Sequence, residues 1–322
     1  MSEKTFADGA RVAMVGDSIT QSGFGVAYIQ DYYLTHLPER RVKVYNLGIS
    51  GDNAYGATLD ARFAEIFAVR PTEVVVMFGA NDMNSRAYGS PAPTPEMLEA
   101  RAVARRRHLD AMVCLVGMLR ERGLPVTLCS AVGRNEHTEA EEGFRTYGAN
   151  DALYAMYRDN LAAIGEGNLK NTVDYLSPIQ ALQAEICAMG GPSLYEGDRT
   201  HLSVLGQAMM ARVLLASQGL PVTLPSAAAL AAGWREKPLS QALRERHAIE
   251  HRWRDLAWVY PGRAESTRGL TLDARIEFWR REALREDLPA YYPKLYRHYV
   301  ENAKNEEAIL GDYLAKTDAL YE

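Results

Sequence analysis

The feature that most constrains the fold is an alternation of strand-like and helix-like segments through the first 225 residues. Several strand-like segments are uninterrupted apolar runs, and Val74–Phe78 is the clearest of them. Such runs are typical of strands that are buried on both faces in a parallel sheet. The five strand candidates are Arg11–Val15, Arg41–Tyr45, Glu73–Phe78, Pro125–Ser130 and Thr172–Leu176. The alternation predicts right-handed β-α-β units in a doubly wound α/β sheet.

Helix candidates lie between these strands, and local signals mark some of their ends. Thr94 offers an N-cap to the longest candidate, Pro95 occupies its first position, and Gly123 and Pro125 follow its end. The six helix candidates are 25–37, 57–69, 95–122, 150–164, 178–189 and 203–217. They supply the helical layers on the two faces of the predicted sheet.

The composition of the chain changes near residue 225. Charged residues number 45 among residues 1–225 but 32 among residues 226–322, and all four tryptophans lie in the second part. The spacing of Ile276, Trp279 and Ala283 gives an apolar stripe on a charged helix. We therefore predict a domain of residues 1–225 and an all-helical C-terminal extension of residues 226–322. The stripes are compatible with packing, with a lid or with an interface that forms a homo-oligomer.

Charge and cysteine content exclude several classes of protein. The net charge of −5 argues against nucleic acid as a partner, because phosphate binding needs a clustered basic face. Three separated cysteines without a CxxC pair favour neither a disulfide framework nor a zinc finger. No apolar run is long enough for a membrane span, and residues 1–10 lack the apolar segment of a signal peptide. We expect a cytoplasmic location.

Short polar motifs follow three successive strand candidates. Ser18 comes directly after the first strand in Gly16-Asp17-Ser18, two glycines lie in the loop after the second, and Asn81 follows the third. Parallel strands bring their carboxyl ends to one edge of the sheet, where such folds place their ligands. A serine hydroxyl can act there as a nucleophile, and the Asn81 amide can donate a hydrogen bond to a developing oxyanion. Each motif alone is also compatible with an ordinary turn or helix cap.

Asp198 and His201 supply the partners that a serine nucleophile needs. A serine hydroxyl requires a base, and the base requires an acceptor for its other ring nitrogen. Asp198 and His201 lie three positions apart on one loop, just before a helix that Ser203 caps. The pair therefore meets both needs.

Together these motifs resemble the SGNH hydrolase superfamily, also called the GDSL esterase/lipase family, over about residues 10–220. The resemblance implies a three-layer α/β/α sandwich with a mostly parallel five-stranded sheet, similar to flavodoxin. It implies a catalytic triad of Ser18, His201 and Asp198. The oxyanion hole would consist of the Ser18 N–H, the Gly51 N–H and the Asn81 side chain, with Gly48 as a rival for the second donor.

The resemblance implies a serine esterase that works through an acyl-enzyme and needs no metal or organic cofactor. The polar residues Asn84, Arg86 and Tyr88 follow Asn81 and are candidates for substrate binding. Their polarity favours a short ester, such as an acetyl ester of a carbohydrate or another polar alcohol, as the small-molecule substrate. One alternative is a lipolytic enzyme or thioesterase that acts on longer acyl chains. The alternative from another class is a non-catalytic binding module on the same fold.

Overall fold

A computed structural model describes residues 4–138, 144–259, 270–288 and 290–322. The chain forms two compact units, Met1–Leu239 and Ser240–Glu322. The predicted domain of residues 1–225 lies inside the first unit, and its boundary stays a prediction. Within the described ranges, no helix combines the length and the apolar character that crossing a membrane requires.

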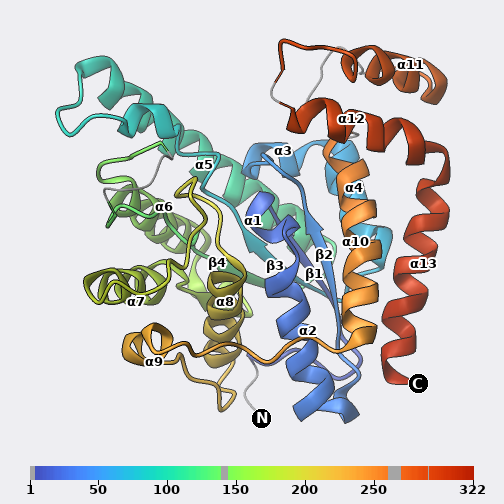
Figure 1. The fold of residues 1–322 in the computed structure, drawn as a ribbon, viewed down its shortest axis with the longest axis horizontal. Coiled ribbons are helices and arrows are strands. Elements are labelled where there is room, and N and C mark those ends of the chain that lie inside the picture. Colours follow the sequence, from blue (N-terminus) through green and yellow to red (C-terminus); the bar gives the residue numbers. More distant parts are fainter. Residues whose placement is uncertain (1–3, 139–143, 260–269, 289) are drawn as a thin grey trace. The chain divides into compact units, whose positions relative to one another are not determined.

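The first unit contains a five-stranded sheet in the order β2-β1-β3-β4-β5, and all its neighbouring strands are parallel (Figure 1). The strands are β1 (Arg11–Gly16), β2 (Lys43–Gly48), β3 (Glu73–Met77), β4 (Val126–Cys129) and β5 (Asn171–Val173). The register places Gly16 of β1 beside Gly48 of β2 and Met77 of β3. The loops after these three strands therefore leave the sheet at the same edge.

Helices cover both faces of the sheet and give the three-layer α/β/α sandwich that the family resemblance implies (Figure 1). One layer contains α2 (Phe24–His36), α7 (Leu176–Ala188), α8 (Val204–Ser217) and the short α9 (Ala227–Ala231). The other layer contains α4 (Asp60–Ile66), α5 (Pro95–Glu121) and α6 (Ala149–Ile164). Shorter elements complete the unit: α1 (Ser18–Gln21), α3 (Ala54–Thr58), η1 (Pro38–Arg40), η2 (Phe67–Val69), η3 (Ser85–Tyr88) and η4 (Glu166–Asn168).

The caps expected from the sequence are present. Thr94 Oγ1 accepts a hydrogen bond from the Met97 N–H at 3.3 Å, and Ser203 Oγ accepts one from the Gly206 N–H at 3.2 Å. The apolar faces of α2, α7 and α8 form one buried cluster with side chains of β1 such as Val12. This core holds the strand ends and the helix starts in fixed positions, which is what a site at the sheet edge requires.

Two predicted segments differ from the structure. The single helix expected over 57–69 is instead α3, α4 and η2, because Leu59 is extended between α3 and α4. The last strand ends at Val173 and the chain turns into α7 at Leu176. There the Ser130 hydroxyl accepts hydrogen bonds from the Tyr175 and Leu176 N–H groups, at 2.9 and 3.0 Å, and this bonding ends the extended segment.

The second unit is all-helical, as predicted. Its helices are α10 (Gln241–Val259), α11 (Leu272–Glu282), α12 (Tyr291–Asn302) and α13 (Glu306–Asp318), with the turns η6 (Ala303–Asn305) and η7 (Ala319–Tyr321). The guanidinium of Arg246 on α10 donates to Thr317 and Tyr313 of α13, at 3.0 and 2.8 Å. The centre of the Trp279 ring on α11 lies 4.6 Å from that of Tyr296 on α12, so Trp279 of the predicted apolar stripe packs against a neighbouring helix.

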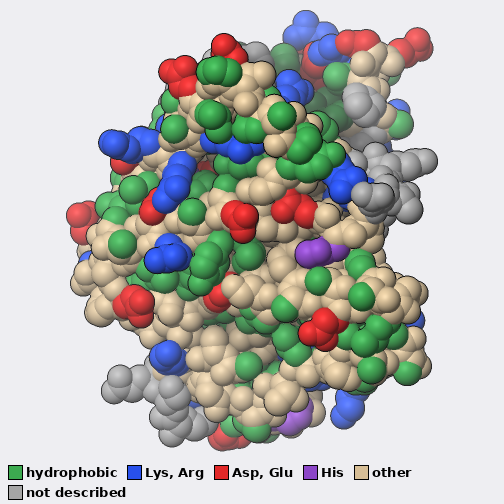
Figure 2. Space-filling model, turned by 90° about the vertical axis from the view of Figure 1, so that its left-hand side faces the viewer, with side chains coloured by type: hydrophobic (Ala, Val, Ile, Leu, Met, Phe, Trp, Pro, Cys, Tyr) green, Lys and Arg blue, Asp and Glu red, His purple; other side chains and the backbone are tan. Residues whose placement is uncertain are grey.

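The molecular surface mixes side chains of different kinds. On the face shown in Figure 2, acidic and basic side chains lie among apolar ones. This mixture matches the nearly balanced totals of 36 Lys and Arg against 41 Asp and Glu.

Candidate active site

Ser18 is the first residue of α1, at the point where the chain leaves β1. Asp17 caps this short helix, and its Oδ1 accepts a hydrogen bond from the Ile19 N–H at 2.9 Å. Gly16 is required here, because a Cβ at this position would lie 2.8 Å from the Met77 carbonyl oxygen. The strand end, the glycine and the cap together hold the Ser18 side chain partly exposed at the sheet edge.

His201 and Asp198 reach Ser18 from the loop before α8, 183 residues later in the chain. The Nε2 of His201 lies 2.8 Å from the Ser18 Oγ. Its Nδ1 forms a hydrogen bond with Asp198 Oδ2. Asp198 Oδ1 also accepts the backbone N–H groups of Thr200 and His201, each at 2.9 Å. The predicted serine, histidine and aspartate thus form one continuous hydrogen-bonded chain.

The interactions between His201 and Asp198 shift the pKa values of these two residues in opposite directions. The hydrogen bond to Asp198 raises the pKa of His201 above its ordinary value, although burial acts against this shift. Burial alone would raise the pKa of Asp198, but the hydrogen bonds from His201 and Thr200 hold it below its usual range. Because an ionised Asp198 only accepts hydrogen bonds, it selects the tautomer with the proton on Nδ1. Nε2 is then the acceptor that faces the Ser18 hydroxyl.

Arg199 anchors the loop that carries Asp198 and His201, a role that the sequence analysis missed. Its side chain is buried, and its NH1 donates to the carbonyl oxygens of Thr138 and Asn135 at 2.6 and 3.3 Å. The Asn135 N–H donates back to the Arg199 carbonyl at 2.9 Å. Arg199 has a φ of 65°, in the left-handed region that non-glycine residues seldom adopt. No spacing in the sequence signals this anchor.

Asn81 and the loop after β2 form the opposite side of the site. The Asn81 amide donates to the Asp52 carbonyl oxygen at 2.8 Å, which uses one of its two N–H hydrogens. Gly51 has a φ of 71° in the turn that the Asp52 N–H closes on the Ile49 carbonyl at 3.0 Å. Gly48 instead lies at the end of β2, where its N–H donates to Asn46 Oδ1 at 2.9 Å.

Two more carboxylates fix the loops after β2 and β3. Asp52 accepts a hydrogen bond from the Nε of the buried Arg62 at 2.8 Å. Asp82 Oδ1 accepts the Ala54 N–H at 3.0 Å and lies 3.2 Å from Nδ1 of the buried His108. The sequence analysis assigned no role to His108 or to Arg62. The side chains that meet Asp52 and Asp82, those of Arg62 and His108, lie on helices whose approach depends on the fold.

Asp17 is a fully buried carboxyl directly beside the proposed nucleophile. Burial raises the pKa of Asp17 to about 7, the Ile19 N–H opposes this shift, and the charges of Asp82 and Asp52 add to it. The protonation state of Asp17 therefore changes within the ordinary pH range. The sequence analysis assigned no role to this residue.

The three residues predicted to bind substrate lie in different surroundings. Asn84 and Arg86 are exposed, and Asn84 lines the groove described below. Tyr88 is buried, and the Arg101 guanidinium lies 4.1 Å from the centre of its ring. Direct contact with substrate is therefore easier for Asn84 and Arg86 than for Tyr88, and all three roles stay predictions.

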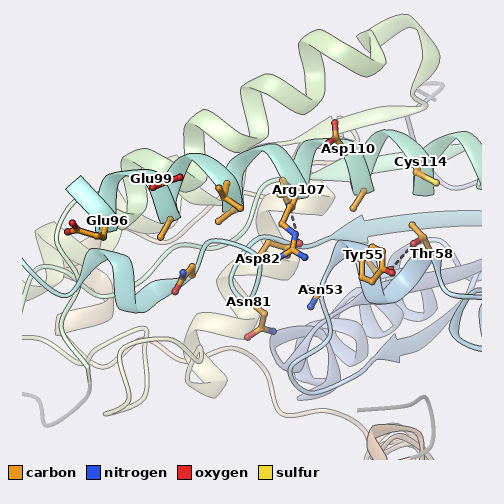
Figure 3. Close-up of a pocket in the computed structure, with 16 residues that line it drawn as sticks. Asn53, Tyr55, Thr58, Asn81, Asp82, Glu96, Glu99, Arg107, Asp110 and Cys114 are labelled. Atoms are coloured by element: carbon orange, nitrogen blue, oxygen red, sulfur yellow. Dashed lines mark hydrogen bonds and ion pairs between the residues drawn. The ribbon is translucent and has the colours of Figure 1, made fainter. Parts of the chain in front are cut away.

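An open groove runs between α3 and α5, and Asn81 is one of the residues that line it (Figure 3). Its volume is about 1120 Å³. The residues that line it are Asn53, Tyr55, Thr58, Asn81, Asp82, Asn84, Glu96, Glu99, Ala100, Val103, Ala104, Arg107, His108, Asp110, Ala111 and Cys114. In the part of the chain that the structure describes, no three His, Cys, Asp or Glu side chains are arranged to hold a metal ion.

Comparisons with known proteins agree with the sequence resemblance. A model of the GDSL-like Lipase/Acylhydrolase family matches residues 14–209. No curated protein matches the chain. The predicted membership is thus confirmed by a match to more than half of the sequence.

Solved structures share the fold. A gut microbial diltiazem-metabolizing enzyme aligns with 98% of this chain and 96% of its own, at 17% identity and a TM-score of 0.76. A catalytic mutant of an acetylxylan esterase from Geobacillus stearothermophilus aligns with 67% of this chain and 97% of its own, at 26% identity and a TM-score of 0.51. The first alignment extends over the C-terminal helices, and the second covers only about two thirds of the chain.

Proposed function

This chain belongs to the GDSL-like lipase/acylhydrolase family of ester-hydrolysing enzymes, and on that premise we propose that it hydrolyses short-chain esters, acetyl esters above all, of a carbohydrate or another polar alcohol. We propose Ser18 as the nucleophile, His201 as the general base and Asp198 as the residue that orients the base. The single observation that carries this proposal is the 2.8 Å contact between Ser18 Oγ and His201 Nε2, with Asp198 on the other ring nitrogen.

The reaction begins with attack of the Ser18 Oγ on the ester carbonyl carbon. His201 Nε2 takes the hydroxyl proton, and the carbonyl oxygen becomes a tetrahedral oxyanion. His201 then gives the proton to the leaving alkoxide as the carbon–oxygen bond of the ester breaks, which leaves an acyl group on Ser18. A water molecule, deprotonated by His201, attacks the carbonyl carbon of this acyl-enzyme. The bond from that carbon to Ser18 Oγ then breaks, His201 returns the proton to Ser18, and the acid leaves. Asp198 stabilises the imidazolium in both steps without taking its proton.

The oxyanion needs hydrogen-bond donors that are already in place. The first N–H groups of a helix have no partner within the helix, and Ser18 is the first residue of α1. The Asn81 amide keeps a second hydrogen after its bond to Asp52. We propose the Gly51 N–H as the third donor, as the family resemblance implies, and the rival Gly48 N–H donates to Asn46 Oδ1. These positions support an oxyanion hole of Ser18, Gly51 and Asn81.

Two observations support a short acyl group on a polar alcohol. The groove beside Asn81 carries several charged and amide side chains, which can form hydrogen bonds with the hydroxyl groups of a polar alcohol. The similar Geobacillus stearothermophilus protein is an acetylxylan esterase. Both favour acetyl esters of saccharides over the esters of lipids.

The test is hydrolysis of p-nitrophenyl acetate, butyrate and octanoate by the protein and by Ser18→Ala. We expect turnover that falls from acetate to octanoate and is lost in Ser18→Ala. Ser22→Ala is a matched control, since this serine lies on the same turn and its hydroxyl donates to the Ile19 carbonyl oxygen. A maximum at octanoate would favour a lipolytic enzyme or thioesterase. Turnover that survives in Ser18→Ala would contradict the proposed nucleophile.

A further inference from the structure

The groove between α3 and α5 shares Asn81 with the proposed oxyanion hole. A carbonyl oxygen bound by Asn81 would therefore lie beside the groove. The rest of the substrate molecule can extend from there along α5. Ser18, His201 and Asp198 are not among the residues that line the groove, so its side chains other than Asn81 are available for binding without taking part in the chemistry.

The α5 side of the groove is strongly polar. Glu96, Glu99 and Asp110 contribute three carboxylates, and Arg107 contributes one guanidinium. All four residues are exposed, and Figure 3 shows their side chains along the same helix. The apolar residues between them are small, apart from Val103. Hydroxyl groups can bond to such a wall, and the excess of carboxylates repels an anion.

Tyr55 contributes the largest exposed aromatic surface on the α3 side. Its side chain is 64% exposed. Asn53 Oδ1 caps α3 by accepting the Gly56 N–H at 2.8 Å, and the Thr58 hydroxyl donates to the Tyr55 carbonyl at 2.7 Å. The ring is thus carried on a fixed helical turn, across the groove from α5 (Figure 3). An exposed aromatic face on a rigid support offers a packing surface for a ring of the ligand.

The floor of the groove is tied to the catalytic loops. Asp82 and His108 line it and are both largely buried. Asp82 Oδ1 accepts a hydrogen bond from the Ala54 N–H. His108 Nε2 lies 2.9 Å from the Asn160 amide nitrogen on α6. The groove and the loop that carries Gly51 therefore share one buried network. A ligand bound in the groove would lie in a fixed position relative to the oxyanion hole.

We infer that this groove binds the alcohol part of the ester and that it selects a neutral, polyhydroxylated alcohol over an anionic one. Tyr55 packs against a ring of the alcohol, and the side chains of α5 bond to its hydroxyl groups. The inference rests on the proposed ester hydrolysis, because it assigns the alcohol side of the same reaction. The acyl group stays at Ser18 and does not enter the groove.

The first test compares acetylated xylobiose with ethyl acetate, whose alcohol is too small to fill the groove. Acetate release is measured to give kcat/KM for both esters in the unchanged protein, in Tyr55→Ala and in Val103→Trp. The Val103→Trp substitution places a large ring in the groove. We expect the ratio of the two kcat/KM values, xylobiose ester over ethyl ester, to fall about tenfold in each variant, on the scale of one lost aromatic contact. Matched controls are Tyr154→Ala, an exposed tyrosine on α6, and Val113→Trp, an exposed valine on α5 outside the groove. Neither control should change the ratio.

The outcomes separate the two proposals. If the unchanged protein hydrolyses both esters and the ratio stays constant in Tyr55→Ala and Val103→Trp, the groove does not bind the alcohol, while the esterase proposal stands. If the unchanged protein hydrolyses neither ester, both proposals fall. The two variants alter opposite walls, so a folding defect in one, visible in its thermal unfolding, leaves the other to decide.

The second test concerns charge. We expect kcat/KM for an acetylated methyl glucoside to exceed that for the matching glucuronide by about tenfold, because acidic residues outnumber basic ones along this groove. Glu96→Gln combined with Glu99→Gln should lower the ratio of the two kcat/KM values, glucoside over glucuronide, severalfold. Glu185→Gln, an exposed glutamate on α7, is the control that removes a charge elsewhere. Equal rates for the two sugars, or the same ratio in the double variant, would overturn the selection against anions.

Discussion

Asp198→Asn tests how the proposed base is oriented. In the structure, one Asp198 oxygen accepts two backbone N–H groups and the other accepts the His201 ring. The backbone bonds would hold the single oxygen of an asparagine, so its NH₂ group would face His201 Nδ1. Nδ1 must then accept, and Nε2 carries the proton toward Ser18. This is the wrong tautomer for a base, because a protonated Nε2 cannot take the Ser18 proton.

The expected loss is large. In the Ser-His-Asp template, the same change lowers kcat about 10⁴-fold, which corresponds to about 5 kcal/mol of transition-state stabilisation. The pH dependence should change as well. The bond to Asp198 raises the pKa of His201, so the pH at which kcat/KM reaches half of its plateau should lie above 6.5 in the unchanged protein and lower in the variant.

The assay is p-nitrophenyl acetate hydrolysis from pH 5 to 9, with Glu196→Gln as the control. Glu196 lies on the same loop, and its charge also raises the pKa of His201. The ring of His201 bonds to Asp198 and Ser18 and not to Glu196, so removal of the Glu196 charge should change kcat less than about threefold. A loss of less than about tenfold in Asp198→Asn, or equal losses in both variants, would refute the assigned role.

Three further predictions concern other parts of the molecule. Asn81→Ala should lower kcat by about 10²–10³-fold with a smaller change in KM, and a nearly normal kcat in steady-state assays would remove Asn81 from the oxyanion hole. Asp17→Asn should raise the melting temperature more at pH 8 than at pH 5. The pKa of Asp17 is raised to about 7, so the stability that the protonated carboxyl contributes in acid is lost as the pH rises through 7. An asparagine is uncharged at both pH values and can still accept the Ile19 N–H. Equal shifts at both pH values would contradict this. Residues 1–239 alone should unfold cooperatively in calorimetry, because they form one compact unit, and a broad transition would show that they depend on the C-terminal helices.

The sequence predicts much of the fold because its signals are local. The apolar runs locate the strands, and the glycines and short polar residues after β1, β2 and β3 mark the loops at the sheet edge. Parallel topology then brings Ser18 and Asn81 to one edge without further information, whereas His201 lies in the loop between α7 and α8 and is not placed by it. The break at Leu59 was not predictable in the same way. The spacing of apolar residues indicates a helix but does not reveal a single extended residue between two helices.

The supporting residues could not be predicted because their partners are distant in sequence. His108 meets Asp82 from a helix, Arg62 meets Asp52 from another, and Arg199 reaches the carbonyl oxygens of a separate loop. Each is a buried charged or polar side chain in a segment that reads as an ordinary helix or turn. Their roles depend on the angle at which one element packs on the next, which local patterns do not specify.

The most direct test of the account is covalent labelling with a fluorophosphonate, which reacts with a serine hydroxyl that a neighbouring base activates. The 2.8 Å contact with His201 predicts one adduct per chain, on Ser18, with loss of esterase activity in proportion to labelling. His201→Ala should abolish the labelling. Loss of activity with the adduct on another serine, or full activity after Ser18 is completely labelled, would contradict the proposed nucleophile.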